Sequence, residues 1–201
     1  ASKDVILKVA TMLTVKGGTG KIVEYFGEGA RSMSATSKGT ITNMGAEIGA
    51  TTSTFGYDDM MDPYLRATDR GPIADLCKQY AEHLRSDASV EADPQKYYDE
   101  YYEIDLNTLE PHIVGPHTPD LGRPVSAMSA EVDEKGYPEK LSAGLIGSCT
   151  NSSYEDMARA VSLVRQAKAA GITAKSSLMV TPGSETIYQT IKRDGILKEF
   201  E

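Results

Sequence analysis

The sequence contains few cysteine and histidine residues, which are the usual ligands of metal and redox sites. It has 201 residues with no tryptophan, three histidines and two cysteines, Cys77 and Cys149. Two cysteines are too few for a disulfide scaffold. No Cys-x-x-Cys pair occurs, and one cysteine alone cannot hold a metal cluster. The chain therefore offers at most part of such a site.

An excess of basic residues is also missing. Acidic residues number 29 against 21 basic ones, giving a formal net charge of -8. This balance disfavours binding to nucleic acid or an anionic membrane, since a phosphate-binding surface needs a basic patch. No apolar run approaches the length of a membrane-spanning helix. The first residues, Ala1 to Asp4, lack the features of a signal or transit peptide, but such peptides are removed from mature proteins, so the compartment cannot be read from them.

What is present is typical of a globular protein with its own core, with 40% hydrophobic and 25% charged residues. The hydrophobic periodicity predicts helices at 2–15, 40–50, 58–68, 72–84, 153–170 and 185–194, and strands at 22–26, 102–106, 144–147 and 176–181. Strands and helices alternate with short loops beyond residue 141, which predicts a parallel sheet covered by helices. The predicted fold class is α/β, with two α/β units and a mainly parallel sheet in the C-terminal one.

A stretch rich in proline and glycine separates the two predicted units. Pro111, Gly115, Pro116, Pro119, Gly122 and Pro124 punctuate an extended connector. The predicted boundaries are a first unit at 1–115, a connector at 116–140 and the start of a second unit at 141–201. His112 and His117 lie beside these prolines, and without a third candidate ligand they are interpreted as structural. Cys77 lies between Leu76 and Tyr80, which favours a packed interface.

The glycine-rich turn at 16–21 invites comparison with a phosphate-binding loop. The Walker pattern requires glycine where Val15 stands and serine or threonine where Ile22 stands. It also requires a strand before the loop and a helix after it, whereas here the predicted order is reversed. The turn is therefore not interpreted as a nucleotide site.

Cys149 is the cysteine with a distinctive position. It follows the predicted strand 144–147, and ligand sites in open α/β sheets form beyond the carboxyl ends of strands. Ser152 and Glu155 have the spacing of a capping box, which predicts a helix start directly behind it. The thiol is a nucleophile, a metal ligand or a small buried residue. A cysteine nucleophile would need a histidine base, for which there is no local signature, and the Gly-x-Ser-x-Gly elbow of serine hydrolases is absent.

The predicted helix 40–50 has two different faces. Ile41, Met44 and Ile48 are expected to pack inward. Asn43 and Glu47 are four residues apart and are expected to share the opposite face. Gly45 and Gly49 each cost about 1 kcal/mol of helix stability, which suggests that another backbone or a ligand approaches closely. The alternative is a solvated polar face.

Four blocks of this sequence resemble the aconitase family: LTVKGGTG at 13–20, NMGAEIGATTS at 43–53, GSCTNSSYEDM at 147–157 and TPGSE at 181–185. They occur in the family's order, so the resemblance covers essentially the whole chain. It implies three α/β domains around an iron–sulfur cluster and a fourth, mobile domain. This chain would span the second domain and the first part of the third.

The resemblance also implies a function. The family interconverts citrate and isocitrate through cis-aconitate, with a 4Fe–4S cluster that is held by three cysteines and whose fourth iron acts as a Lewis acid. The expected partners are a small tricarboxylic acid substrate and the remaining aconitase domains, without nucleic acid or membrane, and the expected compartment is the mitochondrial matrix. Cys149 matches one cluster ligand. Asn43 matches a residue that hydrogen-bonds the cluster region, and Glu47 one that contacts the water or hydroxyl at the iron.

The two other cluster cysteines would lie in a Cys-x-x-Cys segment shortly after Glu201, so this chain alone is expected to be inactive. The sequence also departs from the family pattern, with Ser37-Lys38 in place of a common Gly-Met and Thr42 in place of Cys. Two alternatives therefore stay open. One is a homoaconitase-like paralogue acting on homocitrate or homoaconitate. The other is a non-catalytic fragment or scaffold that lacks the cluster.

Overall fold

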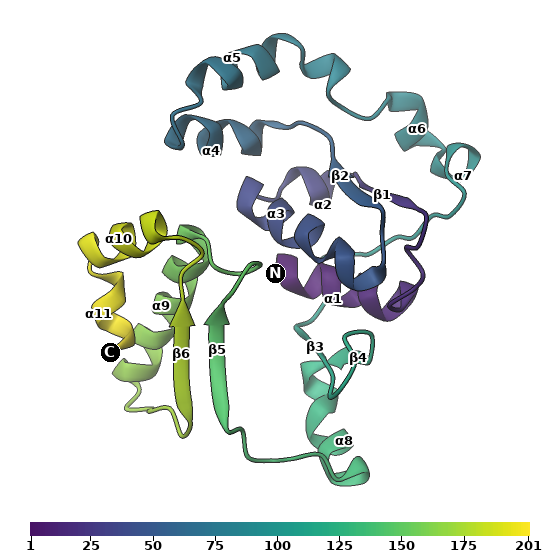
Figure 1. Cartoon of the computed structure of the whole chain (residues 1–201). Coiled ribbons are helices and arrows are strands. Elements are labelled where there is room, and N and C mark those ends of the chain that lie inside the picture. The colour runs from purple at the N-terminus through teal and green to yellow at the C-terminus, as the bar shows by residue number, and fades with distance from the viewer. The chain divides into compact units, whose positions relative to one another are not determined.

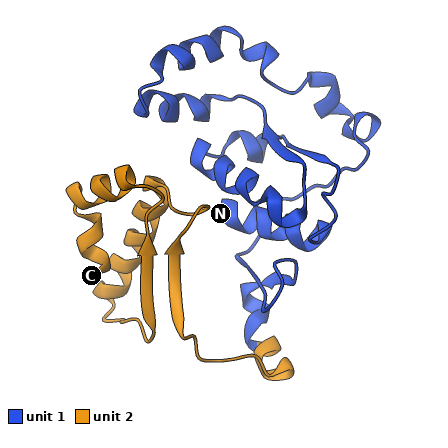
Figure 2. Ribbon diagram, in the orientation of Figure 1, with its two compact units in different colours: residues 1–129 blue, residues 130–201 orange.

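The computed structural model describes residues 1–201 and divides them into two compact units, 1–129 and 130–201 (Figures 1 and 2). The boundary lies within the predicted connector 116–140 and inside helix α8 (Met128–Lys135). Helices and short parallel sheets make up both units, as expected for an α/β fold. None of the helices combines the length and the apolar character needed to cross a membrane.

The first unit contains mostly short elements. In chain order they are α1 (Ser2–Leu13), β1 (Ile22–Tyr25), α2 (Glu28–Arg31), α3 (Ala35–Asn43), the 3-10 helix η1 (Met44–Ile48), β2 (Thr52–Phe55), η2 (Asp59–Met61), α4 (Asp62–Ala67), α5 (Gly71–Gln79), η3 (Ala81–His83), α6 (Ala88–Ala92), α7 (Pro94–Tyr97), β3 (His112–Val114), β4 (Gly122–Pro124) and η4 (Val125–Ala127).

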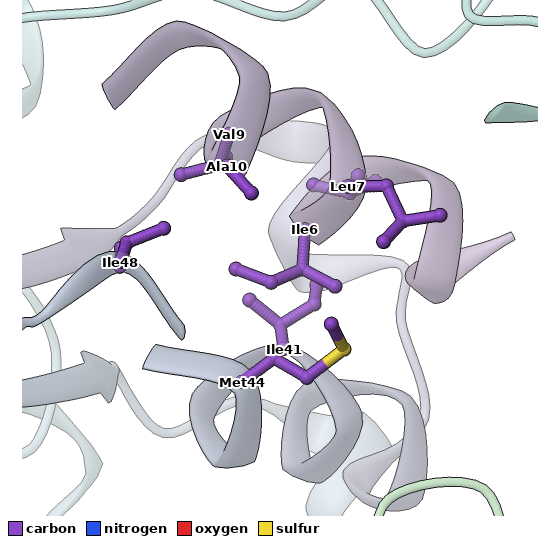
Figure 3. Packing of buried hydrophobic residues seen from close by; sticks show 8 residues of the cluster. Ile6, Leu7, Val9, Ala10, Ile41, Met44 and Ile48 are labelled. Atoms are coloured by element: carbon purple, nitrogen blue, oxygen red, sulfur yellow. The ribbon is translucent and has the colours of Figure 1, made fainter. Parts of the chain in front are cut away.

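The core of the first unit forms where α1 packs on α3 and η1 (Figure 3). Ile6 of α1 and Ile41 of α3 are fully buried, as is Ile48 of η1. The predicted inward face of Ile41, Met44 and Ile48 is therefore confirmed. Beside this core, β1 and β2 pair in parallel from Ile22↔Thr52 onward. The order α1, glycine-rich turn, β1 is the reverse of a phosphate-binding loop, as the sequence predicted.

Residues 40–50 are largely helical, as predicted, but they do not form one regular α-helix. The helix begins earlier, at Ala35, because the Ser34 hydroxyl accepts a hydrogen bond from the backbone N–H of Ser37 at 3.2 Å. It ends at Asn43, and the chain tightens into η1. A β-carbon at Gly45 would lie 2.5 Å from the Ser53 hydroxyl oxygen, so the neighbour there is a side chain. At Gly49 a β-carbon would lie 3.1 Å from the Val15 carbonyl oxygen, which confirms the predicted close approach of another backbone.

Two predictions between residues 102 and 124 are wrong. Residues 102–106 form no strand. Side chains hold this part of the chain, with the Tyr98 hydroxyl donating to Glu24 at 2.6 Å and the Tyr102 hydroxyl to Glu100 at 2.9 Å. Residues 112–124 are not simply extended, because β3 and β4 pair as an antiparallel hairpin that contacts α1.

The second unit follows the predicted alternation. Its elements are β5 (Ala143–Gly147), α9 (Tyr154–Ala169), β6 (Ser177–Thr181), α10 (Glu185–Arg193) and α11 (Ile196–Phe200), the last of which the sequence did not predict. β5 and β6 are parallel, in register from Ala143↔Ser177 to Gly147↔Thr181. The helices bury Met157, Val161, Ile191 and Ile196, against which Ile146 and Val180 of the strands pack.

Candidate functional site

Cys149 lies in the turn that directly follows β5, at the carboxyl end of the parallel pair. Its side chain is exposed, so the interpretation as a small buried residue is wrong. The backbone before it requires glycine. Gly147 has a φ of 130°, and a β-carbon there would lie 2.0 Å from the Thr181 carbonyl oxygen. This close approach to β6 turns the chain so that the thiol faces outward.

Hydroxyl groups flank the Cys149 sulfur. The Ser148 Oγ is 3.9 Å and the Thr150 Oγ1 3.6 Å from Sγ. A hydroxyl can donate a hydrogen bond to a thiolate, which stabilises the anionic form that binds metals. No group of three or more His, Cys, Asp or Glu side chains in the chain is arranged to hold a metal ion. Cys149 by itself is one accessible thiol.

The helix behind the cysteine begins one residue later than predicted. The capping box consists of Ser153 and Asp156, with the Asp156 N–H donating to Ser153 Oγ at 3.1 Å and the Ser153 N–H to the Asp156 carboxylate at 3.1 Å. The predicted pair Ser152 and Glu155 is wrong because Ser152 is buried between two turns. Its carbonyl accepts a hydrogen bond from the Gly183 N–H at 3.0 Å. The turn after β5 is thereby fixed to the turn after β6.

Asn43 and Glu47 occupy the junction of α3 and η1 in the first unit. An α-helix would place residues four apart almost on one line, whereas a 3-10 helix has about three residues per turn and rotates the fourth residue away. Asn43 is accordingly exposed and Glu47 half-buried. The prediction that they share one face of a regular α-helix is wrong.

The Glu47 carboxylate has an unusual environment. Its Oε2 atom is buried and has no hydrogen-bond partner in the chain, and the same holds for the hydroxyl oxygen of Ser53 on β2. Buried polar atoms are nearly always paired, so a carboxylate oxygen that no group of the chain satisfies is able to bind a group from outside it. Ser53 was not singled out from the sequence. Gly45, which makes room for its hydroxyl, was the available signal.

The remaining residues considered from the sequence form no site. Cys77 is half-buried on α5. His112 lies on β3, with Nδ1 at 2.7 Å from the Glu110 carbonyl oxygen. Asn43 and Glu47 belong to the first unit and Cys149 to the second, so the chain carries two separate groups of candidate residues.

Comparison with known proteins decides the family. All of residues 1–201 match the aconitase family, described as aconitate hydratase. The chain belongs to the aconitase family. It is 59% identical over 198 residues to the mitochondrial aconitate hydratase of Gracilaria gracilis, covering 98% of this chain and 25% of that protein. It is 57% identical over 199 residues to the mitochondrial aconitate hydratase of Saccharomyces cerevisiae, covering 99% of this chain and 25% of that protein. The chain thus spans about a quarter of the length of these aconitase relatives.

Proposed function

We propose that this chain is part of an iron–sulfur aconitate hydratase that interconverts citrate and isocitrate through cis-aconitate. The observation that carries the proposal is the exposed Cys149 thiol, which a glycine-dependent turn presents at the end of a parallel strand. The relatives are named mitochondrial aconitate hydratases, and we propose the mitochondrion, in its matrix, as the compartment of this protein too. The substrate is then a small tricarboxylic acid, and the partners of this chain are the other aconitase domains.

The residues of this chain fit the binding of one iron of a 4Fe–4S cluster, through a single cysteine ligand. Cys149 is accessible, and the Ser148 and Thr150 hydroxyls lie close enough to hydrogen-bond its sulfur. Hydrogen bonds to ligand sulfurs tune an iron–sulfur cluster. Two further cysteines from outside this chain complete the ligand set. When bound, the cluster supplies a Lewis-acid iron that polarises a substrate oxygen.

Glu47 is the proposed proton carrier. Dehydration of citrate or isocitrate breaks a C–O bond and a C–H bond on the neighbouring carbon. A base from outside this chain takes the carbon-bound proton, and the hydroxyl leaves as water only if it receives a proton. The buried Oε2 of Glu47, which has no partner in the chain, supplies that proton as a carboxylic acid and recovers it from water in the reverse direction. Asn43, at the end of α3, orients the polar groups beside it through its amide.

The test uses the full-length protein, reconstituted with iron and sulfide under anaerobic conditions. We expect a visible cluster absorbance, conversion of cis-aconitate to citrate and isocitrate, and loss of the cluster in Cys149→Ser. Cys77→Ser is the matched control, because Cys77 is half-buried on α5 and should keep the cluster. Wild-type iron content in Cys149→Ser would remove this cysteine from the metal site.

A second candidate is a homoaconitase-like paralogue, favoured by the departures from the family pattern at Ser37-Lys38 and Thr42. The ratio of kcat/KM for cis-aconitate to that for homoaconitate separates the two. A ratio above one supports the aconitate hydratase, and a ratio below one supports the paralogue. A full-length protein that binds no cluster and hydrates neither acid would instead be the non-catalytic scaffold.

A further inference from the structure

Lys38 and Asp58 form a buried ion pair in the first unit. The Lys38 ammonium donates to the Asp58 carboxylate, and the two side chains are only 4% and 9% exposed. The second carboxylate oxygen of Asp58 accepts a hydrogen bond from the Met60 N–H at 3.0 Å. Charges this deeply buried are tolerated only when they are paired, and removing one partner leaves the other uncompensated. The pair is therefore a strong restraint between the two segments that carry it.

The pair closes a loop around the candidate residues of the first unit. Its members are 20 positions apart, and the chain between them contains the end of α3, all of η1 and all of β2. Lys38 and Asn43 lie on the same helix, α3, so a shift of one moves the other. Asp58 follows β2 closely. Restraining the two ends of such a loop lowers the conformational freedom of everything inside it.

The inside of the loop transmits this restraint because it is closely packed. Gly45 lies against Ser53, and the Ala50 N–H donates to the Gly45 carbonyl at 3.0 Å. Outside the loop, the residue before Asp58 is anchored to the rest of the unit: the Tyr57 N–H donates to the Leu84 carbonyl at 2.7 Å, and Arg85 Nε donates to the Tyr57 carbonyl at 3.1 Å. Asp58 is thus held in place by its neighbours, and its ion pair with Lys38 restrains the position of α3.

We propose that the Lys38–Asp58 pair is a positioning device that holds η1, and with it the Glu47 carboxylate, in its working place. The inference rests on the proposed function, since it gives Glu47 a proton to carry. Neither Lys38 nor Asp58 is a catalytic residue, because both act through the backbone that carries Glu47.

The test is a double-mutant cycle in the full-length, cluster-loaded protein with Lys38→Met, Asp58→Asn and the double variant. We expect each single substitution to lower kcat by about tenfold or more while KM changes less than about threefold. The double variant should lose about as much as the worse single variant, because both changes break one interaction. Single variants with wild-type kcat, or a double loss equal to the product of the single losses, would overturn the proposal.

Lys135→Met is the matched control. Lys135 pairs with Glu131 at 3.1 Å on the exposed surface of α8, so the same substitution should leave kcat unchanged. Asp58→Asn keeps the volume of the side chain and an oxygen for the Met60 N–H, so it decides the question if Lys38→Met does not fold. A tenfold loss in Lys135→Met would show that the effect is not specific to the buried pair and would also overturn the proposal.

Amide hydrogen exchange gives a readout that does not depend on turnover. In Asp58→Asn, peptides covering 43–53 should exchange about tenfold faster than in the wild type, whereas peptides from α9 should not change. Wild-type exchange in 43–53 would refute the positioning role. If the wild-type protein shows no hydratase activity, the proposed function fails, and this measurement still tests the restraint.

Discussion

At the scale of single residues, the candidate group around Glu47 shares with Tyr25 and Tyr57 a buried polar atom that has no hydrogen-bond partner in the chain. A carboxylate oxygen of Glu47 and the hydroxyl of Ser53 are both buried without partners, which is costly unless something else satisfies them. The sequence could indicate Glu47 because it stands in a block that resembles the family. It could not indicate Ser53, because an unpaired state depends on burial and on neighbours distant in sequence.

Glu47→Gln keeps the shape of the side chain and removes its ability to carry a proton. We expect kcat of the full-length protein to fall by roughly 10²- to 10⁴-fold, the usual contribution of general acid–base catalysis, with little change in KM. Steady-state hydration of cis-aconitate measures this. The exposed Glu82→Gln, from the same unit, should behave as wild type. A Glu47→Gln variant with unchanged kcat would exclude Glu47 as the proton carrier.

Tyr25 allows a prediction about stability and pH. Burial raises the pKa of Tyr25 to about 12, and its hydroxyl is buried without a partner. Since the folded state holds this proton more tightly than the unfolded state, the free energy of unfolding is unaffected by this ionisation below pH 10 and falls as the pH rises from 10 towards 12. Tyr25→Phe should reduce that loss and raise the free energy of unfolding by about 1 kcal/mol at neutral pH. Urea titrations at several pH values, with exposed Tyr97→Phe as control, check both effects, and a destabilised Tyr25→Phe would show that the hydroxyl is hydrogen-bonded.

At the scale of elements, the sequence predicted well wherever an element is defined by its own periodicity. β5, α9, β6 and α10 lie within about two residues of expectation, since alternating strands and long amphipathic helices carry a local signal. The change from α3 to η1 was missed, because the periodicity of the apolar residues does not distinguish an α-helix from a short 3-10 segment that continues it. The start of α9 was predicted one residue too early, because Ser152 is buried and Ser153 is the N-cap instead.

The turn after β5 depends on glycine at position 147. Gly147→Ala should destabilise the protein by about 3 kcal/mol, because the new methyl group meets both an unfavourable φ and the Thr181 carbonyl. Gly171→Ala is a matched control, since Gly171 also has a positive φ, 69°, but nothing lies within 4 Å of the added carbon. It should cost about 1 kcal/mol. Thermal denaturation compares the two, and equal losses would mean that the close approach to β6 contributes nothing.

At the scale of the whole molecule, the two candidate groups belong to different units, and the chain corresponds to about a quarter of its relatives' length. The sequence predicted the division into two units from the density of proline and glycine. The boundary itself falls in α8, because β3 and β4 contact α1 and so keep the first part of the supposed connector with the first unit.

The last prediction follows from this division. The polypeptide 1–201 has one exposed cysteine and no group of three or more potential metal ligands. After incubation with iron and sulfide, it should therefore remain colourless and should not hydrate cis-aconitate. The full-length protein should instead show the cluster absorbance and hydrate cis-aconitate. Visible absorbance, bound iron per chain and hydratase activity are compared under the same anaerobic conditions. A stable cluster with hydratase activity on residues 1–201 would contradict this prediction.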